Sequence, residues 1–219
     1  MERGWVGRVD GDRVVHLAAQ TLQHFFTGGA GAREHAEYPL AEVVFLAPVL
    51  HPPAVRVFED GRAFAFANPA AVRGPAAVVA PPPGAEELVV LPRLTAVTGA
   101  GGAIGGVTLL AEWRARELEP PKDRDFALVL GPLVVTLDEL PGELEVAVRV
   151  DGEERVRTAV PAAWEPLRAH AARGTELRPG DLLAAPAVGE TGGLLAGASV
   201  VVEAGPIGLL AATVDRAPA

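Results

Sequence analysis

Residues 110–140 read LAEWRARELEPPKDRDFALVLGPLVVTLDEL, and they hold the densest group of ionisable residues in the chain. The apolar run at 126–135 is rich in β-branched residues and predicts a buried strand. Pro120 and Pro121 join the charges to this run, an arrangement that presents polar groups at the end of a sheet. A solvated charged loop is the alternative, and composition alone favours it. The charged residues are Glu112, Arg114, Arg116, Glu117, Glu119, Lys122, Asp123, Arg124 and Asp125.

Length, charge and composition limit the classes of protein that are possible. The 219 residues suit one domain, or one and a half, with room for a core. The net charge of −9 argues against a nucleic-acid partner, which would need a clustered basic face. The absence of cysteine excludes disulfides, thiolate catalysis and zinc-thiolate sites. Apolar runs are too short for a membrane span and the first residues do not resemble a signal peptide, so we expect a soluble cytoplasmic protein.

The 25 glycines and 20 prolines indicate a turn-rich chain with many short strands and few helices. Residues 5–17 alternate around Asp10-Gly11-Asp12 and predict a hairpin, because these turn residues tolerate positive φ. A short helix is expected at 18–26, a loop at 27–38 and a strand at 41–48.

The later part of the chain has equally clear patterns. Residues 143–150 alternate and meet Asp151-Gly152, which predicts a second hairpin that ends at 158. An amphipathic helix is predicted at 161–172. The glycine-rich TGAGGAIG at 98–105 is similar to a dinucleotide-binding turn, but Ala103 replaces the middle glycine. The run after it is too short for a phosphate-binding helix, so we interpret it as a glycine turn.

Four motifs resemble the fumarylacetoacetate hydrolase family. Residues 112–140 contain E-W-x-A-R-E, K-x-x-D and L-G-P-x-V-V-T-x-D-E-L, which are similar to the core signature of that family. VVFLAPVLHPP at 43–53, LRPGDLL at 177–183 and the end of the chain at 194–212 are also similar to family motifs. The resemblance implies a β-rich α+β fold with a rolled mixed sheet, divided into a small N-terminal domain (1–48) and a main domain (49–219). Such domains dimerise in the family.

The chain departs from the family at the positions that carry chemistry. Where the family has a loop with a histidine and a glutamate, this chain has the tight turn Glu59-Asp60-Gly61. The family holds Mg²⁺ with carboxylates, two of them on an E-x-E strand, and here Leu91 and Arg93 take those two positions. Glu112 is the one metal-ligand position that keeps a carboxylate, and we expect no bound metal here. The pattern is similar to the ligand-poor repeat of homoprotocatechuate-pathway decarboxylase/isomerases.

Arg93 places a positive charge where the family has a negative one. We therefore hypothesise that Arg93 and Glu112 form an ion pair in place of the metal ion. This hypothesis predicts that replacing Glu112 destabilises the fold.

Three functions are compatible with the resemblance. An enzyme would act on a 2-oxo or 1,3-dicarbonyl dicarboxylate as a hydrolase, isomerase or decarboxylase, with Lys122 stabilising an oxyanion, Glu112 as ligand or base and Arg116 steering the substrate carboxylate. A non-catalytic subunit would form a homodimer, or a heteromer with an active paralogue, and the same residues with Asp125 would be an ion-pair cluster. A binding module would hold a small 2-oxo acid in the vestigial cleft.

Overall fold

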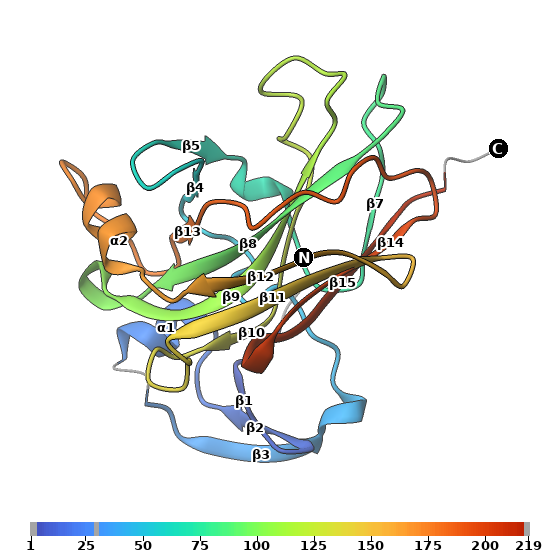
Figure 1. Cartoon of the computed structure of the whole chain (residues 1–219). Helices are drawn as coiled ribbons and strands as arrows, with labels where there is room; N and C mark the ends of the chain where they lie inside the picture. The colour runs from blue at the N-terminus through green and yellow to red at the C-terminus, as the bar shows by residue number, and fades with distance from the viewer. Residues whose placement is uncertain (1–3, 29–30, 217–219) are drawn as a thin grey trace.

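The computed structural model describes residues 4–28 and 31–216, and strands dominate it (Figure 1). A three-stranded antiparallel sheet lies at the N-terminus, with the order β1-β2-β3. Gly11 has a φ of 59° in the turn between its first two strands, which confirms the predicted hairpin. The strands are β1 (Gly7–Asp10), β2 (Arg13–Leu17) and β3 (Glu34–Pro39).

Two predictions for the N-terminal region were wrong. A loop was expected at 27–38, but residues 34–38 of it lie in β3, because the free edge of β2 supplies backbone partners. Residues 41–48 were expected to be a strand, but a 3₁₀ turn (Leu40–Glu42) and an irregular segment lie there instead. Val44 in this segment has 83% of its surface exposed whereas Ala47 is buried, so the apolar run is only partly buried.

Helix α1 (Leu22–Thr27) begins four residues later than predicted, where the side chain of Thr21 accepts a hydrogen bond from His24 N at 3.1 Å. Phe26 on this helix is buried against the turn that follows β8. A Cβ atom on Gly105 would lie 2.8 Å from the Phe26 ring, so this glycine allows the helix to approach the main sheet.

The main part of the molecule has two sheets. A mixed seven-stranded sheet has the order β5-β4-β13-β8-β9-β10-β6, with the long hairpin of β8 and β9 near its centre (Figure 1). The turn of this hairpin is the glycine-rich segment, where a short 3₁₀ turn (Ala100–Gly102) leads directly into β9. The strands are β4 (Val55–Phe58), β5 (Phe64–Ala67), β6 (Val72–Arg73), β8 (Val89–Thr98), β9 (Ile104–Arg114), β10 (Leu128–Val135) and β13 (Leu182–Ala184).

The second sheet has five strands in the order β12-β11-β14-β15-β7. Its β11 and β12 form the hairpin that Asp151-Gly152 predicted. Helix α2 (Glu165–Ala171) is shorter than the predicted 161–172, and it buries Leu167 and Ala171. The strands are β7 (Ala77–Val79), β11 (Glu143–Val150), β12 (Glu153–Pro161), β14 (Ser199–Ala204) and β15 (Gly208–Val214).

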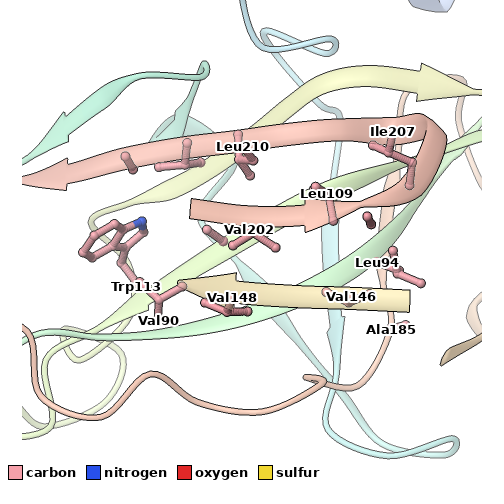
Figure 2. Close-up of a cluster of buried hydrophobic side chains, with 14 of the residues drawn as sticks. Val90, Leu94, Leu109, Trp113, Val146, Val148, Ala185, Val202, Ile207 and Leu210 are labelled. Atoms are coloured by element: carbon pink, nitrogen blue, oxygen red, sulfur yellow. The ribbon is translucent and has the colours of Figure 1, made fainter. Parts of the chain in front are cut away.

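The main core lies between these two sheets. Leu94, Leu109 and Trp113 from the β8–β9 hairpin pack with Val148 and Leu210 from the five-stranded sheet (Figure 2). Burying each large side chain contributes about 1.5–3 kcal/mol, so this layer accounts for much of the fold's stability. Neighbouring residues of a strand point to opposite faces, and Leu110 therefore joins a second cluster on the other face of the seven-stranded sheet.

The β-rich α+β class with a curled mixed sheet is confirmed. The division at residue 48 stays a prediction, although the N-terminal sheet ends before it. Across the described ranges 4–28 and 31–216, no helix has the length and apolar character that a membrane span requires.

We predict that Gly106→Ala destabilises the protein. A Cβ atom there would lie 2.7 Å from Val135 O and 2.6 Å from a Val134 methyl carbon, where β10 lies against β9. The overpacking is expected to lower the free energy of unfolding by about 1–3 kcal/mol, measured by urea denaturation. Gly61→Ala is the control, because nothing lies within 4 Å of its Cβ position, and its free energy of unfolding should change by less than about 1 kcal/mol. Equal effects of both substitutions would contradict the packing argument.

Candidate functional site

The candidate site lies on the face of the β8–β9 hairpin that points away from the main core. Leu91 of β8 is directly opposite Glu112 of β9 in the register, and Arg93 is the diagonal neighbour of Glu112. Arg93 Nε donates a hydrogen bond to Glu112 Oε2 at 2.7 Å, and both side chains are buried. The predicted ion pair between the two residues is therefore confirmed.

Arg93 is fully buried, with an exposed fraction of 0%. Its Nη1 donates to two backbone carbonyls, Phe58 O at 2.6 Å and Ala185 O at 2.9 Å. Phe58 ends β4 and Ala185 follows β13, so one guanidinium connects three strands of the sheet. Burial lowers the pKa of Arg93, and the negative charge of Glu112 opposes that shift.

A second arginine holds the other oxygen of Glu112. Arg114 Nε donates to Glu112 Oε1 at 2.8 Å, so each oxygen of this carboxylate accepts from a guanidinium. Burial alone would lower the pKa of Arg114, but hydrogen bonds and charges from Glu112 and Glu59 raise it above the usual value. The carboxylate of Glu112 is therefore held by two cations.

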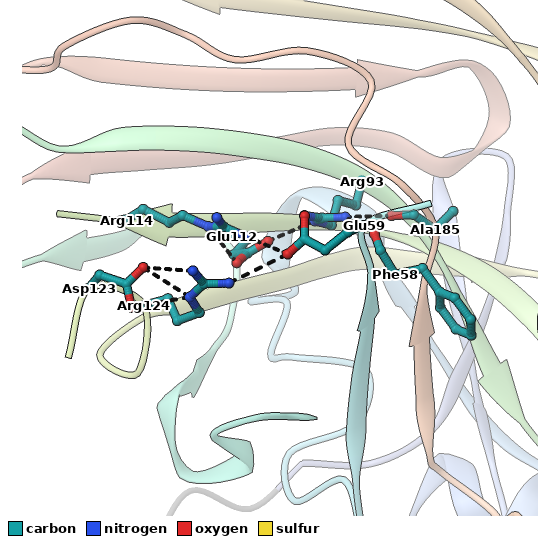
Figure 3. A network of polar contacts seen from close by, with 8 residues as sticks. All are labelled: Phe58, Glu59, Arg93, Glu112, Arg114, Asp123, Arg124 and Ala185. Carbon is teal, nitrogen blue, oxygen red and sulfur yellow. Dashed lines mark hydrogen bonds and ion pairs between the residues drawn. The ribbon is translucent and has the colours of Figure 1, made fainter. Parts of the chain in front are cut away.

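Glu59 lies at the solvent side of these residues and contacts the arginines. Its Oε1 lies 3.0 Å from Arg114 Nη2 and 3.4 Å from Arg124 Nη1, and its Oε2 lies 3.8 Å from Arg93 Nη2 (Figure 3). Arg124 also binds both oxygens of Asp123 through Nε, at 3.1 and 3.0 Å. Three positive and three negative side chains thus balance one another. We call them the ion network: Arg93, Arg114, Arg124, Glu59, Glu112 and Asp123.

The three residues predicted as catalytic have separate ion partners, so the predicted ion-pair cluster of these residues with Asp125 does not form. Glu112 belongs to the ion network, whereas Lys122, with 75% of its side chain exposed, pairs with Asp125 at 2.7 Å. Arg116, with 65% of its side chain exposed, pairs with Glu190. Their roles in catalysis stay predictions.

Sequence reasoning missed Glu59, Arg114 and Arg124 as members of the site. Arg114 could have been found, because it lies two residues after Glu112 on the same strand and therefore on the same face. Glu59 was interpreted only as part of a tight turn, and nothing local connects it to residues more than fifty positions away.

A pocket of about 340 Å³ lies beside the ion network. Leu91 and Arg116 line it, but Lys122 does not. Two basic and four acidic residues face it, so the pocket has a net negative charge. In the part of the chain that the structure describes, no three histidine or acidic residues are grouped so that they could hold a metal ion. The lining residues are Val89, Leu91, Arg114, Arg116, Glu117, Leu118, Glu119, Pro120, Asp123 and Glu190.

A second buried ion pair explains the LRPGDLL motif at 177–183. Asp181 Oδ2 accepts from Arg56 Nη1 at 2.9 Å and from Arg178 N at 3.1 Å. Asp181 therefore holds the turn before β13 and anchors it to β4. Its role is structural.

The sequence profile described as fumarylacetoacetate (FAA) hydrolase C-terminal matches residues 47–215. No curated protein sequence matches the chain. Several solved structures, however, are similar to the chain. Maleylpyruvate hydrolase from Sphingobium sp. SYK-6 has 21% sequence identity and a TM-score of 0.82, and the alignment covers 98% of this chain and 97% of that one.

Two further structures are similar over nearly their whole length. 5-Carboxymethyl-2-hydroxymuconate delta-isomerase from Mycobacterium smegmatis has 23% identity and a TM-score of 0.78, with 97% of this chain and 94% of that chain covered. The Sphingobium maleylpyruvate hydrolase in complex with manganese(II) ion and pyruvate has 21% identity and a TM-score of 0.79, with coverages of 99% and 98%. At these identities, the likeness establishes the fold.

We predict strong energetic coupling between Arg93 and Glu112. Glu112→Met leaves the buried Arg93 guanidinium without a hydrogen-bonded carboxylate, which is expected to cost about 3–5 kcal/mol of unfolding free energy. Arg93→Met should cost less, because Arg114 still pairs with Glu112. The double variant should lose clearly less than the sum of the two losses, because neither charge is then left alone. Urea denaturation of the four proteins measures this cycle.

Arg116→Met is the control for this cycle, because it breaks an exposed pair with Glu190. It should cost less than about 1 kcal/mol. Additive losses in the double variant would show that the buried pair is not a unit.

Proposed function

The chain belongs to the fumarylacetoacetate hydrolase family, and we propose that it is a divergent member in which an arginine has replaced the divalent metal ion. The single observation that carries the proposal is the 2.7 Å hydrogen bond between Arg93 Nε and Glu112 Oε2. It joins a guanidinium at one family metal-ligand position to the carboxylate at another. The positive charge that a metal would supply is then part of the protein.

The residues present do not fit a divalent cation. Mg²⁺ requires about six oxygen ligands at close to 2.1 Å, usually from carboxylates and water. Leu91 offers no ligand atom, and both oxygens of Glu112 already accept hydrogen bonds from guanidinium groups. A cation placed at Glu112 would also be repelled by Arg93 and Arg114. No metal-assisted step is therefore part of the proposal.

We propose a non-catalytic role, as a cytoplasmic subunit that assembles with itself or with a paralogue. The tight turn at Glu59 supports this role, because it lies where the family has the loop with its histidine and glutamate. A general base must reach the proton that it removes, and the turn carries no histidine. Lys122 is exposed to water and paired with Asp125, which is a poor environment for stabilising an oxyanion.

An active enzyme of 2-oxo dicarboxylate catabolism is the second candidate. The names of the structural relatives favour it, because they include a hydrolase and an isomerase. The pocket argues against it, because its net negative charge disfavours a dicarboxylate substrate.

Assembly has support from two exposed apolar side chains on the outer face of the five-stranded sheet, Val78 and Leu209. Val78 on β7 is in register with Thr213 on β15, and Leu209 lies on the same face of β15. Val78 and Leu209 are 64% and 55% exposed. We call Val78, Leu209 and Thr213 the outer patch. Large exposed apolar side chains that share one face suit a protein interface.

We predict that the wild-type protein does not bind Mn²⁺ or Mg²⁺ with micromolar affinity and has no metal-dependent hydrolase activity on maleylpyruvate. Isothermal titration calorimetry of the EDTA-treated protein measures the binding. The Sphingobium maleylpyruvate hydrolase, whose structure contains manganese, is the positive control. Micromolar binding that Glu112→Gln abolishes would overturn the proposal.

We predict a dimer in solution, with twice the 22.6 kDa mass of the chain, measured by light scattering during size-exclusion chromatography. Leu209→Arg should shift the protein towards the monomer, because it adds a charge to the outer patch. Val44→Arg is the matched control, since Val44 is exposed outside this patch and should not change the mass. A monomeric wild type would contradict self-assembly and leave the heteromer to be tested by co-expression with a paralogue.

A further inference from the structure

Three arginines converge on one carboxylate at the solvent side of the ion network. Arg93, Arg114 and Arg124 each place a terminal guanidinium nitrogen within 3.0–3.8 Å of an oxygen of Glu59 (Figure 3). A surface ion pair needs only one cation, so three around a single carboxylate form a more specific anion site.

The arginines are fixed and the carboxylate is not. The side chains of Arg93, Arg114 and Arg124 are 0%, 17% and 26% exposed, whereas that of Glu59 is 47% exposed. Each arginine also has partners apart from Glu59: Glu112 holds the first two, and Asp123 holds Arg124. Withdrawing Glu59 would therefore leave the three guanidinium groups in place.

Glu59 can withdraw without unfolding its turn. Its backbone N donates to Ala63 O at 3.0 Å, and Asp60 Oδ1 accepts from Arg62 N and Ala63 N at 2.6 and 2.7 Å. These bonds hold the turn by its backbone and by Asp60. Rotation of the Glu59 side chain towards solvent breaks none of them.

Glu59 also leaves one guanidinium nitrogen unsatisfied. Arg93 Nη2 is buried and has no hydrogen-bond partner, because Glu59 Oε2 at 3.8 Å is too distant for a hydrogen bond. Buried donors are nearly always paired, so this nitrogen marks a place for an acceptor. A carboxylate that is not tethered to the β4–β5 turn can approach it more closely than Glu59 does.

The net charge of the three arginines and their remaining partners determines which class of ligand fits. Without Glu59, the three arginines face Glu112 and Asp123, which leaves one positive charge uncompensated. One carboxylate restores neutrality. The neighbouring pocket is net negative, so a second carboxylate on the ligand would be repelled there.

We propose that Arg93, Arg114 and Arg124 form a binding site for a small monocarboxylate, and that Glu59 is a built-in occupant that competes with this ligand. The site rests on the proposed function in one respect, because both require the Arg93 guanidinium in place of a metal ion. Glu59 sets the affinity: ligand binding requires its side chain to leave the three arginines. The free protein is thereby held in a self-occupied state.

Chemical rescue of Glu59→Ala tests the proposal, with sodium acetate as the probe in buffer that contains EDTA. The variant should unfold at a lower temperature than the wild type. Acetate should then raise its Tm saturably, by roughly 3–6 °C at ten times its Kd or more, at constant ionic strength. The wild type should respond at least tenfold more weakly at the same acetate concentration, because Glu59 competes. Acetamide, which is neutral and of the same shape, should have no effect.

Two matched variants localise the effect. Glu190→Ala removes a carboxylate from the exposed pair with Arg116, and acetate should not rescue it. Adding Arg124→Met to Glu59→Ala should abolish the response to acetate. Glu59→Ser, which also removes the carboxylate from the three arginines, replaces Glu59→Ala if the latter does not fold, and its acetate binding is then measured by calorimetry. An acetate response that is equal in all variants, or absent in Glu59→Ala, would overturn the proposal.

This outcome is separate from that of the metal titration. Because EDTA is present throughout, acetate rescue cannot arise from a bound metal. Micromolar Mn²⁺ binding by the wild type would reject the proposed function even if rescue were observed. Failure of rescue without Mn²⁺ binding would reject the carboxylate site alone.

Discussion

The buried ion pair of Arg93 and Glu112 is the interaction on which the rest of the site depends. A charge removed from water is very costly unless it is paired and its remaining donors are satisfied. Arg93 therefore needs Glu112 together with the carbonyls of Phe58 and Ala185, which come from different strands. The positions of β4, β8, β9 and β13 are linked by this one requirement. A hydrophobic residue in the place of Arg93 would impose no such directional constraint.

The features that could be predicted from the sequence are those that depend on neighbours in the chain. The hairpin turns at Gly11 and Gly152 were found because their residue types tolerate the backbone conformation. The pair of Arg93 and Glu112 could be predicted because the resemblance implies an arginine at a position where the family has a carboxylate, near Glu112. The strand predicted at 41–48 was wrong, because an apolar run becomes a strand only where another strand offers hydrogen bonds.

The contacts of Glu59 could not be predicted from the sequence, because they join residues that are far apart in the chain. Glu59 meets Arg114 and Arg124 across 55 and 65 positions of the chain. Their contact is produced by the packing of β4 and of the loop before β10 against the ends of the hairpin. Local patterns carry no information about such contacts. Exposure then distinguishes the buried pair of Arg93 and Glu112, which the fold requires, from Glu59, which has the most exposed side chain of the network.

The β8–β9 hairpin also has a consequence for the order in which the chain folds. Arg93 and Glu112 are only 19 positions apart and lie on adjacent antiparallel strands. Closing so short a loop is fast and loses little chain entropy, so the two charges can meet before distant strands arrive. We therefore expect β4 and β13 to dock later and to cover a pair that is already neutral. Such an order would avoid the kinetic barrier of dehydrating a lone guanidinium.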